Sequence, residues 1–120
     1  MIEKNDLVYI KHILDSINAV TDFSKGIDKE ELISNRMKQS AIVREIEIIG
    51  EAVKNVSEDT KNRYRGIKWK EIAGTRDKMI HHYFGVDSDI VLAIIKKDIP
   101  ELKKGILKIE KDLEKNNPIT

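Results

Sequence analysis

The sequence contains no cysteine, and this absence excludes several classes of protein at once. Disulfide scaffolds, thiolate zinc sites, iron–sulfur centres and cysteine nucleophiles all require that residue. Proline and glycine are also scarce, with two and six residues among 120. Their scarcity argues against extended disorder and against turn-rich β architectures.

The chain also lacks an excess of one charge and any long apolar run. Lys and Arg number 22 against 21 Asp and Glu, so a surface that binds nucleic acid must be a local patch. The longest apolar run, Ile90–Ile95, has six residues, whereas a membrane span needs roughly 20. No secretory signal is recognisable near the N-terminus. We therefore expect a cytoplasmic protein without membrane contact.

What the chain has in abundance is helical periodicity. Hydrophobic residues make up 40% of it, enough for one core in a single domain of residues 1–120. Apolar side chains recur at steps of three and four, which predicts helices over about 5–21, 28–56, 69–82, 88–97 and 100–114. Asn35 divides the second stretch, and Met37 is expected to face inward. We predict an all-α fold, an antiparallel bundle of four long helices plus short helices.

Single residues mark the expected ends of these helices. Asn5 or Asp6 is predicted to cap the first helix and Asp87 the helix that follows it at 88–97. Gly85 is expected to stop the helix over 69–82, and Pro100 to start the last helix.

Gly50 lies in the middle of the long helix. Glycine costs about 1 kcal/mol against alanine at such a position. Another backbone is therefore expected to approach the helix closely there.

The densest cluster of residues that can carry chemistry spans 76–83 and reads Arg-Asp-Lys-Met-Ile-His-His-Tyr. Adjacent histidines point about 100° apart on a helix, and helical metal pairs use steps of three or four, so we expect no metal site. A histidine can transfer a proton near neutral pH, and the planar donor fork of arginine suits phosphate. These are sufficient parts for cleaving RNA, in which the 2′-hydroxyl supplies the nucleophile.

The geometry of a straight helix would separate these two groups. Arg76 and His81 are five residues apart, which is roughly 140° around a helix axis. Either the helix bends near His81 or a second subunit completes the site. The same residue types also have structural roles, because arginine pairs with carboxylates, histidine favours helix C-termini and tyrosine fills core edges. Spacing alone leaves both interpretations open.

The order Arg76, four residues, His81, one residue, Tyr83 resembles the R-x4-H-x-Y motif of HepT-like proteins. These are small HEPN-domain toxins that are encoded with a minimal nucleotidyltransferase. Three further stretches resemble the family at matching positions: Ile49-Gly50-Glu51-Ala52 on the long helix, Trp69 and Ile72 before the arginine, and Val86-Asp87 after the tyrosine, with valine in place of isoleucine.

The resemblance implies a metal-independent endoribonuclease that cleaves cellular RNA in a cleft at a homodimer interface. It implies the toxin component of a type VII-like toxin–antitoxin module. By position, Arg76 and His81 are the catalytic pair and Asp77 is a supporting polar residue. Tyr83 matches the tyrosine that the partner nucleotidyltransferase adenylylates to silence the toxin. The chain itself then needs no cofactor, because ATP is the partner's substrate.

A second interpretation belongs to a different class of protein. The chain would be a non-catalytic helical partner, or a regulatory target, of a nucleotidyltransferase. Tyr83 could still be modified in that case, but replacing His81 would leave cell growth unaffected. His82 occupies a variable position of the motif and is assigned no role.

Segment 61–70, expected to be a loop, carries basic residues just before the motif. It can grip an RNA backbone, with Tyr64 available for stacking on a base. Alternatively it is a solvated loop, and we favour anchoring in the core for Trp69. The RNA-binding candidates are Arg63, Arg65, Lys68 and, inside the motif segment, Lys78.

Overall fold

The computed structural model describes residues 2–81 and 85–116, with side chains described for 6–81 and 85–115. Most of these residues are helical, so the prediction of an all-α fold is confirmed. The elements are α1 (Ile2–Phe23), α2 (Lys29–Ser34), α3 (Arg36–Asn55), α4 (Glu58–Arg63), α5 (Trp69–Ala73), α6 (Thr75–Met79), β1 (Ile80–His81), β2 (Gly85–Val86), α7 (Ser88–Ala93), the π-helical segment η1 (Ile94–Asp98) and α8 (Ile99–Asn116).

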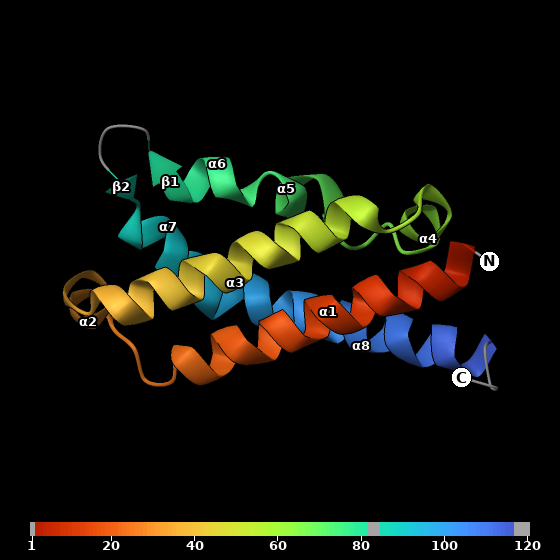
Figure 1. Cartoon of the computed structure of the whole chain (residues 1–120), viewed down its shortest axis with the longest axis horizontal. Coiled ribbons are helices and arrows are strands. Elements are labelled where there is room, and N and C mark those ends of the chain that lie inside the picture. The colour runs from red at the N-terminus through yellow and green to blue at the C-terminus, as the bar shows by residue number, and fades with distance from the viewer. Residues whose placement is uncertain (1, 82–84, 117–120) are drawn as a thin grey trace.

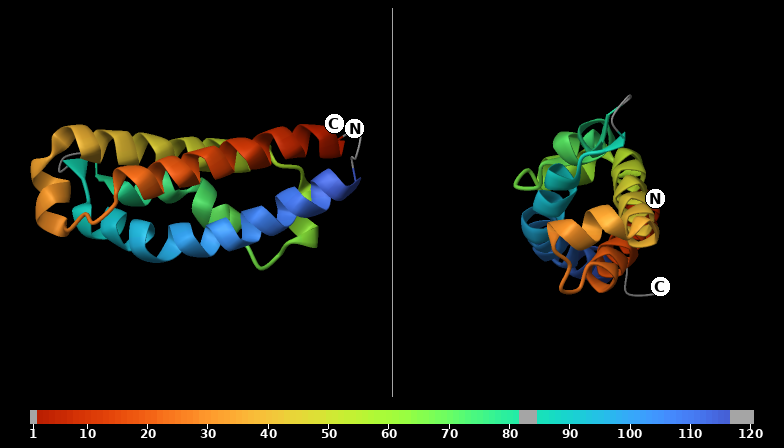
Figure 2. Two further views of the ribbon diagram at one scale, coloured as in Figure 1. Left: turned by 90° about the horizontal axis from the view of Figure 1, so that it is seen from below. Right: turned by 90° about the vertical axis from the view of Figure 1, so that its left-hand side faces the viewer.

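The long elements form an antiparallel bundle. α1, α3, the α5–α6 pair and the segment from α7 to α8 run alternately in opposite directions (Figure 1). α1 packs along α3 and α8, and α3 also packs against α5 and α6. The end-on view in Figure 2 shows the helices gathered around a common axis. None of the described helices is long and apolar enough to cross a membrane.

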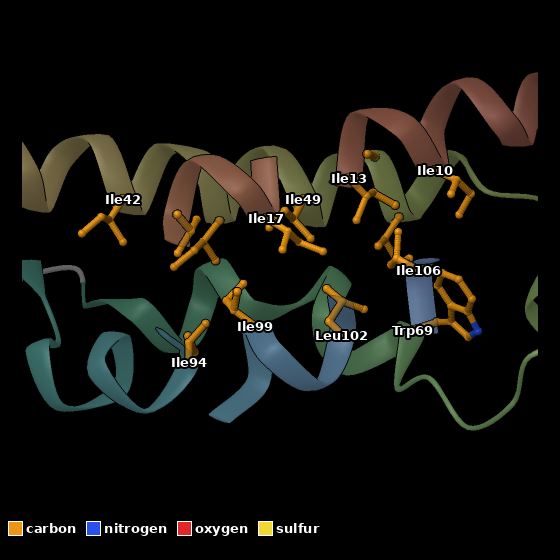
Figure 3. Packing of buried hydrophobic residues seen from close by; sticks show 14 of the residues in the cluster. Ile10, Ile13, Ile17, Ile42, Ile49, Trp69, Ile94, Ile99, Leu102 and Ile106 are labelled. Carbon is orange, nitrogen blue, oxygen red and sulfur yellow. The ribbon is translucent and has the colours of Figure 1, made fainter. Parts of the chain in front are cut away.

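The core is made by the apolar faces that the periodicity predicts. Side chains of α1 and α3 face those of η1 and α8 across the bundle (Figure 3). Each fully buried aliphatic side chain contributes about 1.5–3 kcal/mol. Trp69 is buried, and its indole N–H donates to the carbonyl of Tyr64 at 3.1 Å, which confirms the predicted anchoring of Trp69 in the core.

The close approach predicted at Gly50 is confirmed. A Cβ atom there would lie 3.2 Å from the carbonyl oxygen of Ile72 and 3.6 Å from that of Ala73. The missing side chain therefore lets α5 lie against the backbone of α3. The prediction for Met37 is wrong, since this residue is 82% exposed. Helical periodicity placed Met37 on the apolar face of the helix. It could not show whether another element packs on the first turn of α3.

The predicted cap of the first helix is wrong. Asn5 and Asp6 lie within α1, which begins at Ile2. The Asp6 side chain is buried and accepts hydrogen bonds from the Ser57 backbone N–H at 2.8 Å, from the Ser57 hydroxyl at 2.6 Å and from the Thr60 hydroxyl. Asp6 thus joins α1 to the start of α4, where Ser57 is the N-cap.

Pro100 does not start a helix, because α7, η1 and α8 follow one another without a gap. Proline has no N–H and its ring clashes with the carbonyl four residues back. In η1 the Ile99 N–H bonds to the carbonyl of Ile94, five residues back. This wider π-helical turn accommodates the proline within a continuous helical segment, visible in Figure 2.

Candidate functional site

The motif segment is not the single helix that we predicted over 69–82. Gly74 separates α5 from α6, and the Thr75 hydroxyl bonds to the carbonyl of Glu71 at 3.0 Å. Glycine is a poor helix former, and threonine competes for backbone groups, which explains the break. The segment therefore consists of two short helices rather than one long one.

α6 ends at Met79, and the chain then enters a short hairpin. Ile80 pairs with Val86 and His81 with Gly85 in the antiparallel pair of β1 and β2. The Asp87 N–H donates to the carbonyl of Met79 at 2.7 Å across the base of this hairpin. Gly85 has a φ of 74°, so its left-handed conformation serves the hairpin and does not end a helix. His81 therefore lies beyond the end of the helix that carries Arg76, and the separation of roughly 140° expected for a straight helix does not hold.

Arg76 projects from α6 and is held by a carboxylate of α3. Its Nε lies 2.7 Å from Oε2 of Glu47. The Arg76 side chain is 63% exposed and that of Glu47 20% exposed. The pair borders a pocket of about 380 Å³ between α3 and the α5–α6 junction. Glu51 and Asp77 also line this pocket, so the I-G-E-A stretch and the motif arginine meet there.

His81 is held by a second carboxylate, from the start of α7. Its Nε2 lies 3.0 Å from Oδ2 of Asp87, and the histidine side chain is 48% exposed. Asp87 also accepts the Ile90 N–H at 3.1 Å, so its prediction as N-cap of this helix is confirmed. The hydrogen bond with His81, aided by that of Ile90, holds the pKa of the Asp87 carboxyl below its usual value. Asp87 thus orients the ring through Nε2 and leaves Nδ1 for other contacts.

The structure places the two motif side chains on neighbouring elements. The Ile80 N–H donates to the carbonyl of Arg76, so His81 directly follows the last turn of α6. Both side chains are exposed enough to meet a molecule arriving from solvent. Asp77 is exposed on the same helix. Tyr83, the predicted modification site, lies outside the described residues, as does His82.

The RNA-binding candidates do not surround Arg76. α4 extends through Arg63, so the predicted loop begins later than expected, and Arg63 pairs with Asp59 at 3.1 Å. Arg65 is exposed in the following turn. Lys68 and Lys78 line a different pocket, of about 360 Å³, whose other walls come from α3, α5, α7, η1 and α8.

Tyr64 has a structural role in this conformation. Its hydroxyl donates to Oδ2 of Asp112 at 2.6 Å, which connects the turn after α4 to α8. Burial, together with this hydrogen bond to a carboxylate, raises the pKa of Tyr64 to about 12. The interpretation of this residue as a stacking platform for a base therefore has no support from its contacts.

Replacing Tyr64 by phenylalanine is expected to lower the free energy of unfolding at pH 8 by about 1 kcal/mol, the usual worth of one hydrogen bond. The folded pKa is raised, so the stabilisation is complete below pH 10.0 and is lost as the pH rises to about 12. Denaturant unfolding at pH 8 and 11 should show the two proteins converging at the higher pH. A stability difference that stays constant would contradict this assignment.

Two contacts at the candidate site were not predicted from the sequence: that of Glu47 with Arg76 and that of Asp87 with His81. Glu47 could have been found from its position about one helical turn before Gly50, because another backbone approaches α3 at that glycine. Among the described side chains, no three His, Asp or Glu residues form a group that could hold a metal ion.

Comparison with known proteins identifies the family. Residues 13–109 match the family model described as ribonuclease HepT-like. A protein of Methanocaldococcus jannaschii that is named a putative RNase is 45% identical over 112 residues, covering 92% of this chain and 97% of the relative. A probable ribonuclease HepT of Thermococcus cleftensis is 40% identical over 103 residues, covering 86% and 94%.

A further relative from M. jannaschii is longer. Its name joins a gamma-glutamylcyclotransferase to a putative RNase, and it is 42% identical over 113 residues. The match covers 94% of this chain but 51% of that relative, so the chain spans about half of its length. No solved structure gives a significant match. On the family model and these relatives together, the chain belongs to the HepT-like ribonuclease family.

Proposed function

We propose that this chain is a metal-independent endoribonuclease that cleaves cellular RNA with Arg76 and His81. One observation carries the proposal: both side chains are exposed on adjoining elements, and each is bonded to a carboxylate of another element. Such an arrangement supplies a fixed cation for phosphate and a proton-transfer group with a defined ring orientation. Membership of the HepT-like family supports RNA as the substrate.

The reaction needs no group beyond the RNA and these side chains. The 2′-hydroxyl attacks the adjacent phosphorus, so that the O2′–P bond forms while the P–O5′ bond breaks. A base takes the proton of the 2′-hydroxyl, and an acid gives a proton to the departing 5′-oxygen. His81 fills one of these roles, and Arg76 stabilises the charge that develops on the phosphorus-bound oxygens. The products are a 2′,3′-cyclic phosphate and a 5′-hydroxyl.

The proposal includes a homodimer with the cleavage site at its interface. In one chain Arg76 borders the pocket against α3, whereas His81 is not among the residues that line it. A two-fold axis would bring two copies of the motif together, so that one His81 acts as base and the other as acid.

We further propose that the chain is the toxin of a type VII-like toxin–antitoxin module. A minimal nucleotidyltransferase would transfer AMP from ATP to the hydroxyl oxygen of Tyr83, two residues beyond His81, with release of pyrophosphate and of the hydroxyl proton. The added group is an anionic phosphodiester, which would compete with RNA phosphate for the Arg76 cation. Mass spectrometry of the protein before and after incubation with the partner and ATP would locate this modification.

The proposed activity is tested with purified protein and total cellular RNA in EDTA. Wild-type protein should cleave, and Arg76→Ala should lower the rate by about 10²–10³-fold, because one charge-stabilising donor is lost. End-group analysis should find 2′,3′-cyclic phosphates. Circular dichroism checks that the variant is folded.

Two results would count against the proposal. Equal cleavage by both proteins would assign the activity to another site or to a contaminant. No cleavage by either, with Tyr83 shown to be unmodified, would favour the non-catalytic partner of a nucleotidyltransferase.

A further inference from the structure

The ion pair between Glu47 and Arg76 connects two elements that are far apart in the sequence. Glu47 belongs to α3 and Arg76 to α6, and the atoms Oε2 and Nε are 2.7 Å apart. Glu47 is mostly covered, with a side chain 20% exposed, while Arg76 is 63% exposed. The carboxylate is therefore the fixed member of the pair, and the arginine reaches past it toward solvent.

The backbone packing sets this geometry. Gly50 lies three residues after Glu47, within the same turn of α3. At Gly50 the carbonyl of Ile72 comes within 3.2 Å of the place that a Cβ would occupy. This close approach brings the α5–α6 junction against α3, so the distance between the two charged groups follows from the packing of the backbones.

The atom that Arg76 uses for the pair leaves its other donors available. A guanidinium carries five N–H donors in one plane, and a phosphate fork uses two of them in parallel. Glu47 engages Nε. Within residues 6–81 and 85–115, no other side-chain hydrogen bond or ion pair of Arg76 is found. The bond from Nε to Glu47 therefore fixes the direction in which the two Nη groups point.

We propose that Glu47 is the positioning residue of Arg76: its carboxylate fixes the guanidinium plane through Nε, so that the Nη groups meet an RNA phosphate. This inference rests on the proposed function, because it assigns the arginine an RNA phosphate as ligand. Glu47 itself does not touch the substrate. Without it Arg76 samples many rotamers, and only a fraction of them present the fork in the productive orientation.

The test compares Glu47→Gln with Glu45→Gln. Glu45 lies two residues earlier on α3, is half-buried and lines neither of the two pockets described above. This control removes one carboxylate from the same helix without removing a bond to Arg76. Glu47→Asp, which keeps the charge, serves as the variant for rescue.

The first measurement does not depend on cleavage. In nuclear magnetic resonance spectra, Arg76 Nε–H should give an ordered signal in the wild type and in Glu45→Gln, and a broadened one in Glu47→Gln. Adding an oligodeoxynucleotide, which lacks the 2′-hydroxyl and is not cleaved, should shift the Arg76 Nη signals in the first two proteins only. A disordered Nε–H in the wild type, or equal Nη shifts in all three proteins, overturns the inference.

The second measurement is the kinetics of RNA cleavage. Glu47→Gln should lower kcat by on the order of 10- to 100-fold, the usual effect of misplacing a catalytic group. KM should stay within about twofold because the arginine charge remains, and Glu47→Asp should recover part of kcat. Glu45→Gln should match the wild type.

The two measurements separate the inference from the proposed function. An unchanged kcat in Glu47→Gln overturns the positioning role while leaving the ribonuclease assignment intact. A wild-type protein that cleaves no RNA, with Tyr83 shown to be unmodified, refutes the proposed function. The oligodeoxynucleotide titration then still decides whether Glu47 directs Arg76 toward phosphate.

Discussion

Replacing His81 by alanine is expected to lower the rate of RNA cleavage by about 10²–10⁴-fold, the range for removal of a general acid or base. The ring is oriented by Asp87 through Nε2, at 3.0 Å, which leaves Nδ1 for proton exchange. The side chain is 48% exposed, so its loss creates no cavity in the core. The circular dichroism spectrum should therefore match that of the wild type, and the free energy of unfolding should fall by no more than about 1 kcal/mol, the usual worth of one exposed ion pair.

The adjacent histidine provides the matched control. His82→Ala removes the same side chain one position later and should cleave RNA at the wild-type rate. The rates are measured by single-turnover cleavage of a labelled RNA in EDTA. If His82→Ala loses activity and His81→Ala keeps it, the assignment of the proton-transfer group is wrong. If only the double variant is inactive, the two histidines substitute for each other.

The long helices were predictable because their signal is local. Each of α1, α3 and α8 repeats an apolar side chain every three or four residues, and the core uses those faces. Gly50 was informative for a related reason. A glycine inside a strongly periodic helix has a local cost, so a tertiary contact was the natural explanation, and the carbonyl of Ile72 is that contact.

The hairpin after α6 was not predictable from local pattern. Segment 69–82 has helical spacing, and nothing in it shows that the Met79 carbonyl will bond to the N–H of Asp87, eight residues later. This contact ends the helix before His81 and changes how the side chain is presented. Tertiary hydrogen bonding overrode helix propensity in a short segment, where propensity is a weak guide.

The candidate site was likewise predictable only in part. The spacing of Arg76 and His81 was visible in the sequence, whereas their carboxylate partners were not. Glu47 is 29 positions from Arg76, and only the packing of α6 on α3 brings them together. Asp87 was identified as a helix cap, but its bond to His81 depends on the hairpin. Local sequence thus indicated which groups carry chemistry, and the fold determines how each is held.

Replacing Asp6 by alanine is expected to lower the free energy of unfolding by about 2–4 kcal/mol, the largest stability effect that we expect from a polar side chain here. The carboxylate is 1% exposed and accepts hydrogen bonds from the backbone and hydroxyl of Ser57 and from the hydroxyl of Thr60. Thr60 is fully buried. Alanine would leave the buried Thr60 hydroxyl without its acceptor, at a desolvation penalty, and would remove two further hydrogen bonds from the half-buried Ser57.

Asp15→Ala is the control for Asp6, because it removes an exposed carboxylate from the same helix. It should change stability by no more than about 0.5 kcal/mol. Denaturant unfolding of the three proteins at pH 7 gives both differences. Because Asp6 ties α1 to the start of α4, its loss should also free the turn that leads to α5, measurable as faster amide exchange there. Equal stability of both variants would show that the hydrogen bonds to Asp6 contribute little to the free energy of unfolding.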